Sequence, residues 1–335
     1  MARWSKARMP KHWLTALEKR VRTAWDMMEA FSDEAECRRI LEAMVWARGH
    51  FCPFCGSLSS APIAGRDVGK KARPGLCQCA EPEYRGRFTV TTRTPLHSTK
   101  LKLSALLRAI WRSPQTDKGM SSPPLAELAG VTRTTAWWMS QMIRLLMAPG
   151  EDLLEGHIEA DEVMVGGKRR KDPSDAVARR NKQGHTTKRP VPVTIQRPQT
   201  LELRASPGRA VARPLMGVSA AALQQVISTV VAATATLMTD QHGGFAVVGR
   251  SYADHQSVNH GQLECVRGDV HVNSAEGFND RVRRTVPGVF HHISQQYSER
   301  YLDEVAVRWN QRICTGMATR KSRSGKVRAR ARYDR

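Results

Sequence analysis

Three acidic residues that lie far apart in the chain occupy positions from which their side chains could share metal ions. Asp161 lies inside the apolar run 158–165, Asp240 ends the apolar run 237–240, and Glu276 lies near the start of a segment with helical character. A carboxylate inside a strand is costly to bury unless it binds a metal or a cation. Three carboxylates on two strands and a helix can hold two Mg²⁺ ions, which suits in-line displacement at a phosphodiester. The set therefore predicts metal-dependent chemistry on nucleic acid.

Each of these carboxylates also has an ordinary structural explanation. Asp240 could simply end a strand, and Glu276 could stabilise the first turn of a helix through the helix dipole. The occurrence of all three in suitable elements, in this order, favours the metal site. Arg283 lies two turns after Glu276 on roughly the same helix face. We interpret three histidines as packing residues or phosphate contacts rather than further ligands: His271, His291 and His292.

Four cysteines in the N-terminal half predict a small zinc site. Cys52 and Cys55 belong to a CPFCG knuckle, a turn that directs two thiolates at one zinc ion. The other ligands must come from Cys77 and Cys79, whose CxC spacing is tighter than the usual CxxC. We favour structural zinc over a metal-free module held by its own apolar residues.

Residues 125–137 follow the pattern of a helix-turn-helix. Gly130 supplies the turn, and Thr132 can cap the second helix. The residues expected to face outward, toward DNA, are Arg133, Thr134 and Trp138. Many helical hairpins share this pattern, and the charge of the whole chain favours the DNA-binding interpretation.

The composition indicates a polyanionic partner. The 335 residues include 53 Lys and Arg against 31 Asp and Glu, a formal net charge of +22. Such a surface releases counterions when it neutralises phosphates. A ribosomal-type RNA binder and a membrane-surface protein are the alternatives on charge alone. No apolar run reaches the ~18 residues of a membrane span, no apolar signal core follows the basic N-terminus, and the 7 cysteines are an odd number. We therefore expect a cytoplasmic protein.

The chain divides by composition into successive regions. Residues 1–48 are helical, with an apolar stripe that includes Trp13, Leu14, Leu17, Val21, Trp25 and Met28. Residues 49–98 are rich in Gly, Pro and Cys and end in the strand-like run 87–92, and residues 99–148 hold the helix-turn-helix. Residues 152–312 alternate between strands and helices, as an α/β domain does. The basic tail, residues 313–335, is expected to be irregular and solvated or, if functional, to contact phosphate.

Within the α/β region the pattern predicts individual elements. The predicted strands are 158–165, 191–195, 201–205 and 236–238, with a basic loop over 166–188. The predicted helices are 220–231, 274–284 and 295–310.

Several segments together resemble a known family, the ISXO-type DDE transposases of bacterial insertion sequences (insertion-sequence 1595 family). The matching segments are CPFCG, RFTVTTRTPLHSTKLKL, AELAGVTRTTAWWM, IEADEVMVGGK, LMTD and the long run that begins VRGDVHVNSAEGFND. They extend from about residue 50 to residue 312. The resemblance implies a multidomain α+β protein with an RNase H-like catalytic domain. It also implies binding to the inverted repeats at the element's ends, then cleavage and strand transfer into target DNA.

Carried over by motif, the resemblance makes Asp161 and Asp240 the first two ligands of Mg²⁺ or Mn²⁺. Glu276 matches the third ligand, with Asn273 as the rival, and Arg283 falls where a basic residue accompanies the triad. It also implies a homo-oligomer acting on double-stranded DNA.

The chain departs from the family pattern at the cysteines. Cys77 stands where an aromatic residue is expected and Tyr84 where the second cysteine of the pair is expected, so Cys79 is the better-supported third ligand. Arg93 replaces a glycine. These departures leave open a catalytically inactive, decayed or domesticated transposase that only binds DNA.

Overall fold

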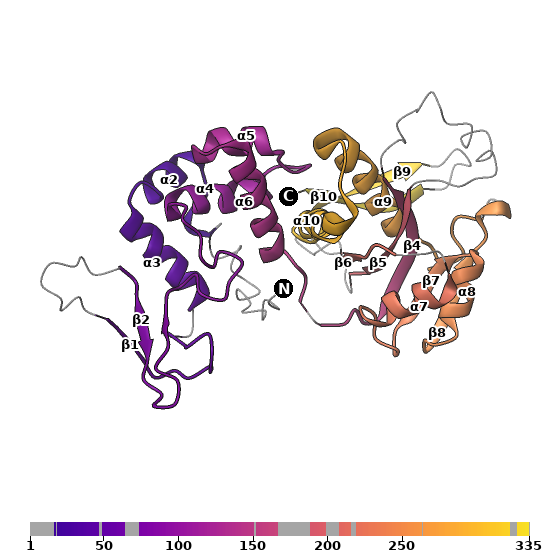
Figure 1. The fold of residues 1–335 in the computed structure, drawn as a ribbon. Coiled ribbons are helices and arrows are strands. Elements are labelled where there is room, and N and C mark those ends of the chain that lie inside the picture. The colour runs from indigo at the N-terminus through magenta and orange to yellow at the C-terminus, as the bar shows by residue number, and fades with distance from the viewer. Residues whose placement is uncertain are drawn as a thin grey trace, which may run out of the picture. The chain divides into compact units, whose positions relative to one another are not determined.

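The computed structural model describes residue 17 and residues 19–46, 49–63, 74–150, 152–166, 188–198, 208–215, 219–262, 264–321 and 327–334. The chain forms two compact units, shown in Figure 1. The first contains residues 1–116 and 120–146, and the second contains residues 117–119 and 147–335.

Two capped helices form the N-terminal part of the first unit. α2 (Ala24–Ala30) begins at a capping box of Thr23 and Asp26, and α3 (Glu34–Val45) begins at the N-cap Asp33. Each cap satisfies backbone N–H groups that a helix start leaves without partners. The predicted continuous helical region is therefore divided into separate helices.

The N-terminal apolar stripe is only partly buried. Leu17 and Val21 are buried, but Trp25 is 76% exposed and Met28 is 60% exposed. The chain leaves the helical path at residues 21–23, so the helical phase is not continued into α2. Trp13 and Leu14 lie outside the described residues.

A small antiparallel sheet carries the second pair of cysteines. Its strand order is β1 (Ser60–Pro62), β2 (Cys77–Cys79) and β3 (Arg87–Phe88). β3 is shorter than the predicted strand 87–92 because the chain turns directly after it. In that turn the Thr92 hydroxyl accepts a hydrogen bond from the Thr89 N–H at 2.9 Å.

Three further helices complete the first unit: α4 (Leu103–Gln115), α5 (Ser122–Ala129) and α6 (Arg133–Leu146). α4 has no side-chain cap of its own, and Glu34 of α3 takes that role by accepting the N–H groups of Leu103 and Ser104 at 2.9 and 3.0 Å. A carboxylate borrowed from another helix thus fixes the start of α4.

The predicted turn between α5 and α6 is confirmed. Gly130 has a φ of 65°, a left-handed conformation that glycine adopts without a Cβ clash. The Thr132 hydroxyl accepts the Thr135 N–H at 3.2 Å, at the start of α6. Ala136, Met139 and Ile143 of α6 are buried.

The second unit is built on a five-stranded mixed sheet in the order β6-β5-β4-β7-β8. The strands are β4 (His157–Val165), β5 (Arg189–Gln196), β6 (Ala210–Ala212), β7 (Thr236–Asp240) and β8 (Asp254–Val258). β4, β5 and β6 form an antiparallel meander, whereas β7 runs parallel to β4 and β8 parallel to β7. Gly208, at a φ of 93°, allows the turn into β6 because a Cβ there would lie 1.9 Å from the Gln196 carbonyl oxygen.

Helices cover both faces of this sheet. α7 (Ala220–Ser228) and α8 (Gly243–Gly249) pack on one face, where Ile158 and Leu237 meet Ile227 and Phe245. α9 (Asn273–Thr285) and α10 (Ser298–Asn310) pack on the other, against Val163 of β4. Short helical turns connect these elements at His260–Gln262, Val286–Phe290 and Gln295–Tyr297.

Most of the predicted α/β elements are confirmed, with differences at the sheet edges. β4, β5, β7, α7, α9 and α10 lie where periodicity places them. The short elements α8, β8 and β6 were not predicted. The predicted strand 201–205 and most of the basic loop 166–188 lie outside the described residues.

The basic tail is more regular than expected. β9 (Ile313–Lys321) and β10 (Val327–Asp334) pair as a two-stranded antiparallel ribbon. Its register places Arg328 opposite Arg320. Across the described parts of the chain, no helix is both long enough and apolar enough to cross a membrane.

Candidate functional site

Asp161 and Asp240 lie at the same level of two neighbouring parallel strands. β4 and β7 pair with Glu159 opposite Met238, and the two aspartates each follow by two residues. Because side chains alternate along a strand, Asp161 shares a face of the sheet with Glu159, and Asp240 shares it with Met238. Met238 packs against Ala275 of α9, so this is the α9 face of the sheet. Adjacent strands are about 4.8 Å apart, which makes the two carboxylates near neighbours.

Helix α9 adds the third carboxylate. The buried Asn279 donates from Nδ2 to Asp161 Oδ2 at 2.7 Å, which fixes this helix face over the middle of β4. Glu276 precedes Asn279 by three residues and therefore lies on the same side of the helix. Unlike Asn279, Glu276 is exposed.

The charges of the three carboxylates act on one another. Burial, reinforced by the negative charges of Asp240 and Glu276, raises the pKa of Asp161 to about 6. Hydrogen bonds from the Glu162 N–H, at 2.7 Å, and from Asn279 oppose this rise. The structure thus brings the three predicted residues into electrostatic range of one another. The three carboxylates do not all lie within 4.8 Å of one another, a condition that only the cysteine cluster meets among the described residues.

The other two predicted catalytic candidates are exposed residues of α9. Asn273 is the exposed first residue of α9, one turn before Glu276. Arg283 is exposed, and its guanidinium pairs with Asp280 on the same helix at 3.2 Å.

Three cysteines converge in the first unit. The ligand atoms of Cys52, Cys55 and Cys79 all lie within 4.8 Å of one another, with the Sγ atoms of Cys55 and Cys79 at 3.5 Å. Gly56, at a φ of 77°, closes the knuckle by donating to the Cys52 carbonyl at 2.9 Å. Burial raises the pKa of Cys52, but the N–H groups of Cys55 and Phe54 outweigh it and lower that pKa, which favours the thiolate that metals bind.

Cys77 and Tyr84 occupy different surroundings from the cluster. Cys77 is buried but is not part of the three-cysteine group, and burial, with the charge of Glu42, raises its pKa. The Tyr84 ring lies against Phe54 of the knuckle, with ring centroids 5.1 Å apart. The charges of all three clustered cysteines contribute to a raised pKa of Tyr84, after burial as the main cause. Tyr84 thus lies beside the knuckle that carries Cys52 and Cys55.

Two family models match the chain. One, described as the ISXO2-like transposase domain, matches residues 153–310, and the other, described as the transposase zinc-ribbon domain, matches residues 32–83. The chain is therefore similar to the ISXO2-like transposases over residues 153–310 and to the transposase zinc ribbon over residues 32–83. A comparison with curated proteins gives no match. The resemblance inferred from the sequence segments is confirmed.

The two matches contain the candidate sites. Asp161, Asp240 and Glu276 all fall inside the transposase domain. The zinc-ribbon match begins at residue 32, and so includes α3 as well as the four cysteines, whereas the sequence predicted a module that starts at residue 49.

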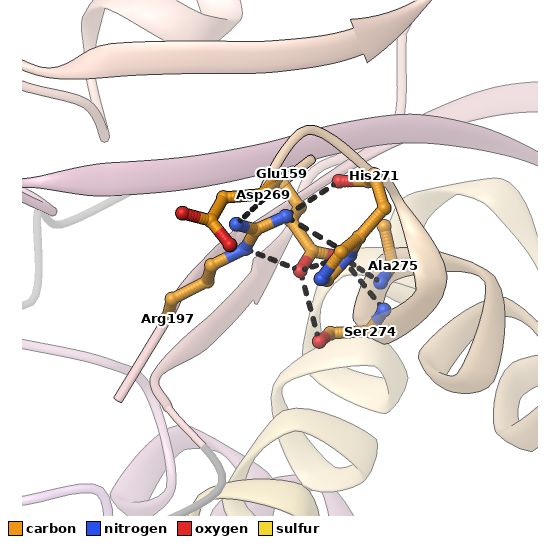
Figure 2. Close-up of polar contacts among 6 residues, drawn as sticks. All are labelled: Glu159, Arg197, Asp269, His271, Ser274 and Ala275. Atoms are coloured by element: carbon orange, nitrogen blue, oxygen red, sulfur yellow. Dashed lines mark hydrogen bonds and ion pairs between the residues drawn. The ribbon is translucent and has the colours of Figure 1, made fainter. Parts of the chain in front are cut away.

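The transposase domain also contains a buried ionic cluster that the sequence reasoning missed. Glu159 is fully buried, and Figure 2 shows its carboxylate between Arg197 and the start of α9. Its Oε1 lies 2.7 Å from Arg197 Nε, and its Oε2 accepts the N–H groups of Ser274 and Ala275 at 2.7 and 3.2 Å. Burial alone would raise the pKa of Glu159, but His271 and Arg197 outweigh it and hold that pKa below its usual value. Alternation along β4 was the available signal, since Glu159 shares a face with Asp161.

The three histidines have packing roles or exposed positions. His271 belongs to the ionic cluster, with Nδ1 2.9 Å from Arg197 Nη2 and 3.3 Å from Glu159 Oε1. His291 is exposed and its Nδ1 lies 3.0 Å from the Pro287 carbonyl oxygen, and His292 is also exposed. His271 therefore agrees with the packing interpretation.

The predicted outward-facing residues of the helix-turn-helix are exposed on α6. Arg133 and Thr134 lie in its first turn, and Trp138 is 53% exposed with its ring packed edge-on against Trp137 at 4.8 Å. The exposed side chains of Arg133, Thr134 and Trp138 are available to a partner molecule.

Proposed function

We propose that this protein is the transposase of an insertion sequence, which binds the inverted repeats at the element's ends and catalyses metal-dependent cleavage and strand transfer. The observation that carries the proposal is the convergence of Asp161, Asp240 and Glu276 on one face of the sheet. The negative charges of Asp240 and Glu276 reinforce the raised pKa of the partly buried Asp161. A carboxylate whose pKa is perturbed by burial and by neighbouring charges is typical of a functional site.

The sheet supports an RNase H-like fold for the transposase domain. An antiparallel meander of three strands is followed by two parallel strands, with the first strand at the centre. Asp161 lies on that central strand, and Asp240 ends the strand beside it. Ligands of α/β sheets gather at the carboxyl ends of such strands.

The donor set fits divalent cations. All three candidate side chains are carboxylates, the ligands that Mg²⁺ and Mn²⁺ prefer, and their mutual repulsion is what a cation would relieve. Asp161, Asp240 and Glu276 would hold the metal, with Asn273 as the alternative to Glu276. Bound Mg²⁺ supplies Lewis-acid activation of the attacking and leaving oxygens at a phosphodiester.

The protein residues have separate roles in this scheme. Asn279 is fully buried, and its hydrogen bond orients the Asp161 carboxylate. Arg283, exposed on α9, contacts DNA phosphate. The zinc-ribbon domain uses Cys52, Cys55 and Cys79 to hold a structural zinc ion, which fixes its short strands.

DNA binding is assigned to three basic or exposed features. Arg133, Thr134 and Trp138 are available on α6, the net charge is +22, and the C-terminal ribbon repeats arginine at every second position of β10. Phosphate contacts position a protein on DNA, whereas base contacts give specificity. We further propose that the protein acts as a homo-oligomer on paired DNA ends in the cytoplasm.

The test is cleavage of DNA that carries the sequences flanking the reading frame, with Mg²⁺. We expect wild-type protein to nick or cut at the end sequences, and Asp161→Ala to lose at least about a hundredfold in rate. Asp254→Ala is the matched control, because Asp254 is exposed on β8 and its side chain accepts from Gln256. Equal cleavage by wild type and Asp161→Ala would remove the assigned site. Binding to the ends without any cleavage would identify the chain as a DNA-binding relative that has lost catalysis.

A further inference from the structure

The start of α9 has no cap of its own. Val272 stands at the N-cap position and makes no side-chain hydrogen bond to the helix. The first N–H groups of a helix need partners, above all where the helix is buried, and Ala275 is completely buried. The partner here is Glu159, which comes from β4 rather than from the segment before α9.

Glu159 connects the start of α9 to the strand that carries Asp161. Its carboxylate accepts both the Ser274 and Ala275 N–H groups, and Oε1 lies 3.0 Å from the Ser274 hydroxyl. Asp161 follows Glu159 by two residues on the same strand, and Glu276 follows Ala275 directly in the helix. The two ends of this connection are therefore each within two residues of a candidate metal ligand.

Arg197 completes the connection from the end of β5. It neutralises Glu159 and also donates to the carbonyl oxygens of Asp269 and His271, at 2.6 and 2.8 Å. These carbonyls belong to the segment that leads into α9, as Figure 2 shows. Strand, helix start and preceding segment are held by one buried ion pair.

We propose that Glu159 is a positioning residue of the transposase domain, which sets the place of Glu276 relative to Asp161 by fixing the first turn of α9 to β4. The inference rests on the proposed metal site. It assigns Glu159 no contact with metal or DNA. Groups behind a metal ligand typically change metal affinity by roughly 10- to 100-fold when they are replaced.

The carboxylate form of Glu159 is required by its neighbours. Arg197, Ser274 and Ala275 all present N–H donors to it. A carboxylate accepts through both oxygens, whereas the amide of glutamine would turn an NH₂ group toward one of these donors. Glu159→Gln therefore keeps the volume of the side chain and breaks the connection.

The test measures Mn²⁺ binding by calorimetry to the zinc-loaded full-length protein, without DNA. We expect Glu159→Gln to weaken binding by roughly tenfold or more, and Asp161→Asn to abolish it. In hydrogen exchange, the amides of Ser274 and Ala275 should exchange faster in Glu159→Gln. Ile227→Val is the matched control for a general loss of stability, since Ile227 is buried on the opposite face of the sheet; it should bind Mn²⁺ as wild type does.

A second variant covers the case in which Glu159→Gln does not fold. Ser274→Ala removes one hydrogen bond and keeps the ion pair, and we expect Mn²⁺ binding to weaken by about threefold. Affinities within the error of wild type for both variants, with Asp161→Asn still defective, would overturn the positioning role and leave the metal site standing. Wild-type affinity in Asp161→Asn would overturn both proposals.

Discussion

At the scale of single residues, the cysteine cluster presents three thiols where a structural zinc ion has four ligands. The Tyr84 ring lies beside the knuckle, at the sequence position where the family pattern expects a cysteine. We therefore predict that Tyr84→Cys raises the affinity for zinc by roughly tenfold or more, because a fourth thiolate completes the tetrahedron. Competition with a chromophoric chelator measures the affinity, and Co²⁺ absorption reports four-sulfur coordination.

Tyr84→Phe is the control for this substitution. It keeps the ring that packs on Phe54 and removes only the hydroxyl, so zinc affinity should stay within about twofold of wild type. A large loss of affinity in Tyr84→Phe would mean that the phenol oxygen itself binds the metal, contrary to the three-thiol arrangement.

Asp303 gives a second prediction at this scale. Burial raises its pKa from 3.8 to about 6, although Arg213, at 2.7 Å, opposes the rise. The folded state therefore holds a proton that the unfolded state has lost. This contribution to stability is complete below pH 4 and disappears as the pH rises through about 6.

The prediction compares the unfolding free energies of wild type and Asp303→Asn. Relative to Asp303→Asn, wild type should lose on the order of 2 kcal/mol of unfolding free energy as the pH rises from 4 to 7. Urea unfolding across this range measures it. A difference that stays constant with pH would show that Asp303 remains ionised throughout.

At the scale of elements, the α5–α6 pair separates packing from recognition. Ala136, Met139 and Ile143 hold α6 in the first unit, while Arg133 in its first turn faces outward. We predict that Arg133→Ala weakens DNA binding by about 1–3 kcal/mol and lowers the salt dependence by about one counterion, without a change in thermal stability. Binding titrations over a range of salt concentrations test this. Arg112→Ala, an exposed arginine of α4, is the control and should behave as wild type.

Borrowed carboxylates recur at this scale. Glu34 of α3 caps α4 in the first unit, and Glu159 of β4 caps α9 in the second. In both cases the helix lacks a capping side chain of its own. Each helix start therefore depends on a tertiary contact, which ties the helix to the element that supplies the carboxylate.

At the scale of the whole molecule, the two units should respond separately to metal removal. The cysteine cluster belongs to the first unit alone, and the second unit has its own hydrophobic clusters. We predict that a zinc chelator increases amide exchange in β1, β2 and β3 by more than tenfold and leaves β4, β5 and β7 protected. Hydrogen exchange on the full chain measures both regions together. Loss of protection in the β4–β7 sheet would show that zinc stabilises both units.

The sequence alone determined the local elements and the family. Apolar alternation predicts β4 and β7, helical periodicity predicts α9, and the Gly130 turn places α5 and α6, because these signals depend on neighbours within a few residues. The candidate carboxylates were visible for the same reason: Asp161 and Asp240 interrupt apolar strands. The cluster of Cys52 and Cys55 was equally visible in its knuckle.

Only the tertiary structure decided which distant residues meet. Strand alternation puts Cys77 and Cys79 on one side of β2, and only the family pattern favours Cys79 as the third ligand. The structure brings Cys79 into the cluster and leaves Cys77 out of it. Glu159 gives no signal of its partners because Arg197 and Ser274 approach it from other elements. Trp25 follows the apolar period and is still exposed, because burial depends on what packs against a face and not on the face itself.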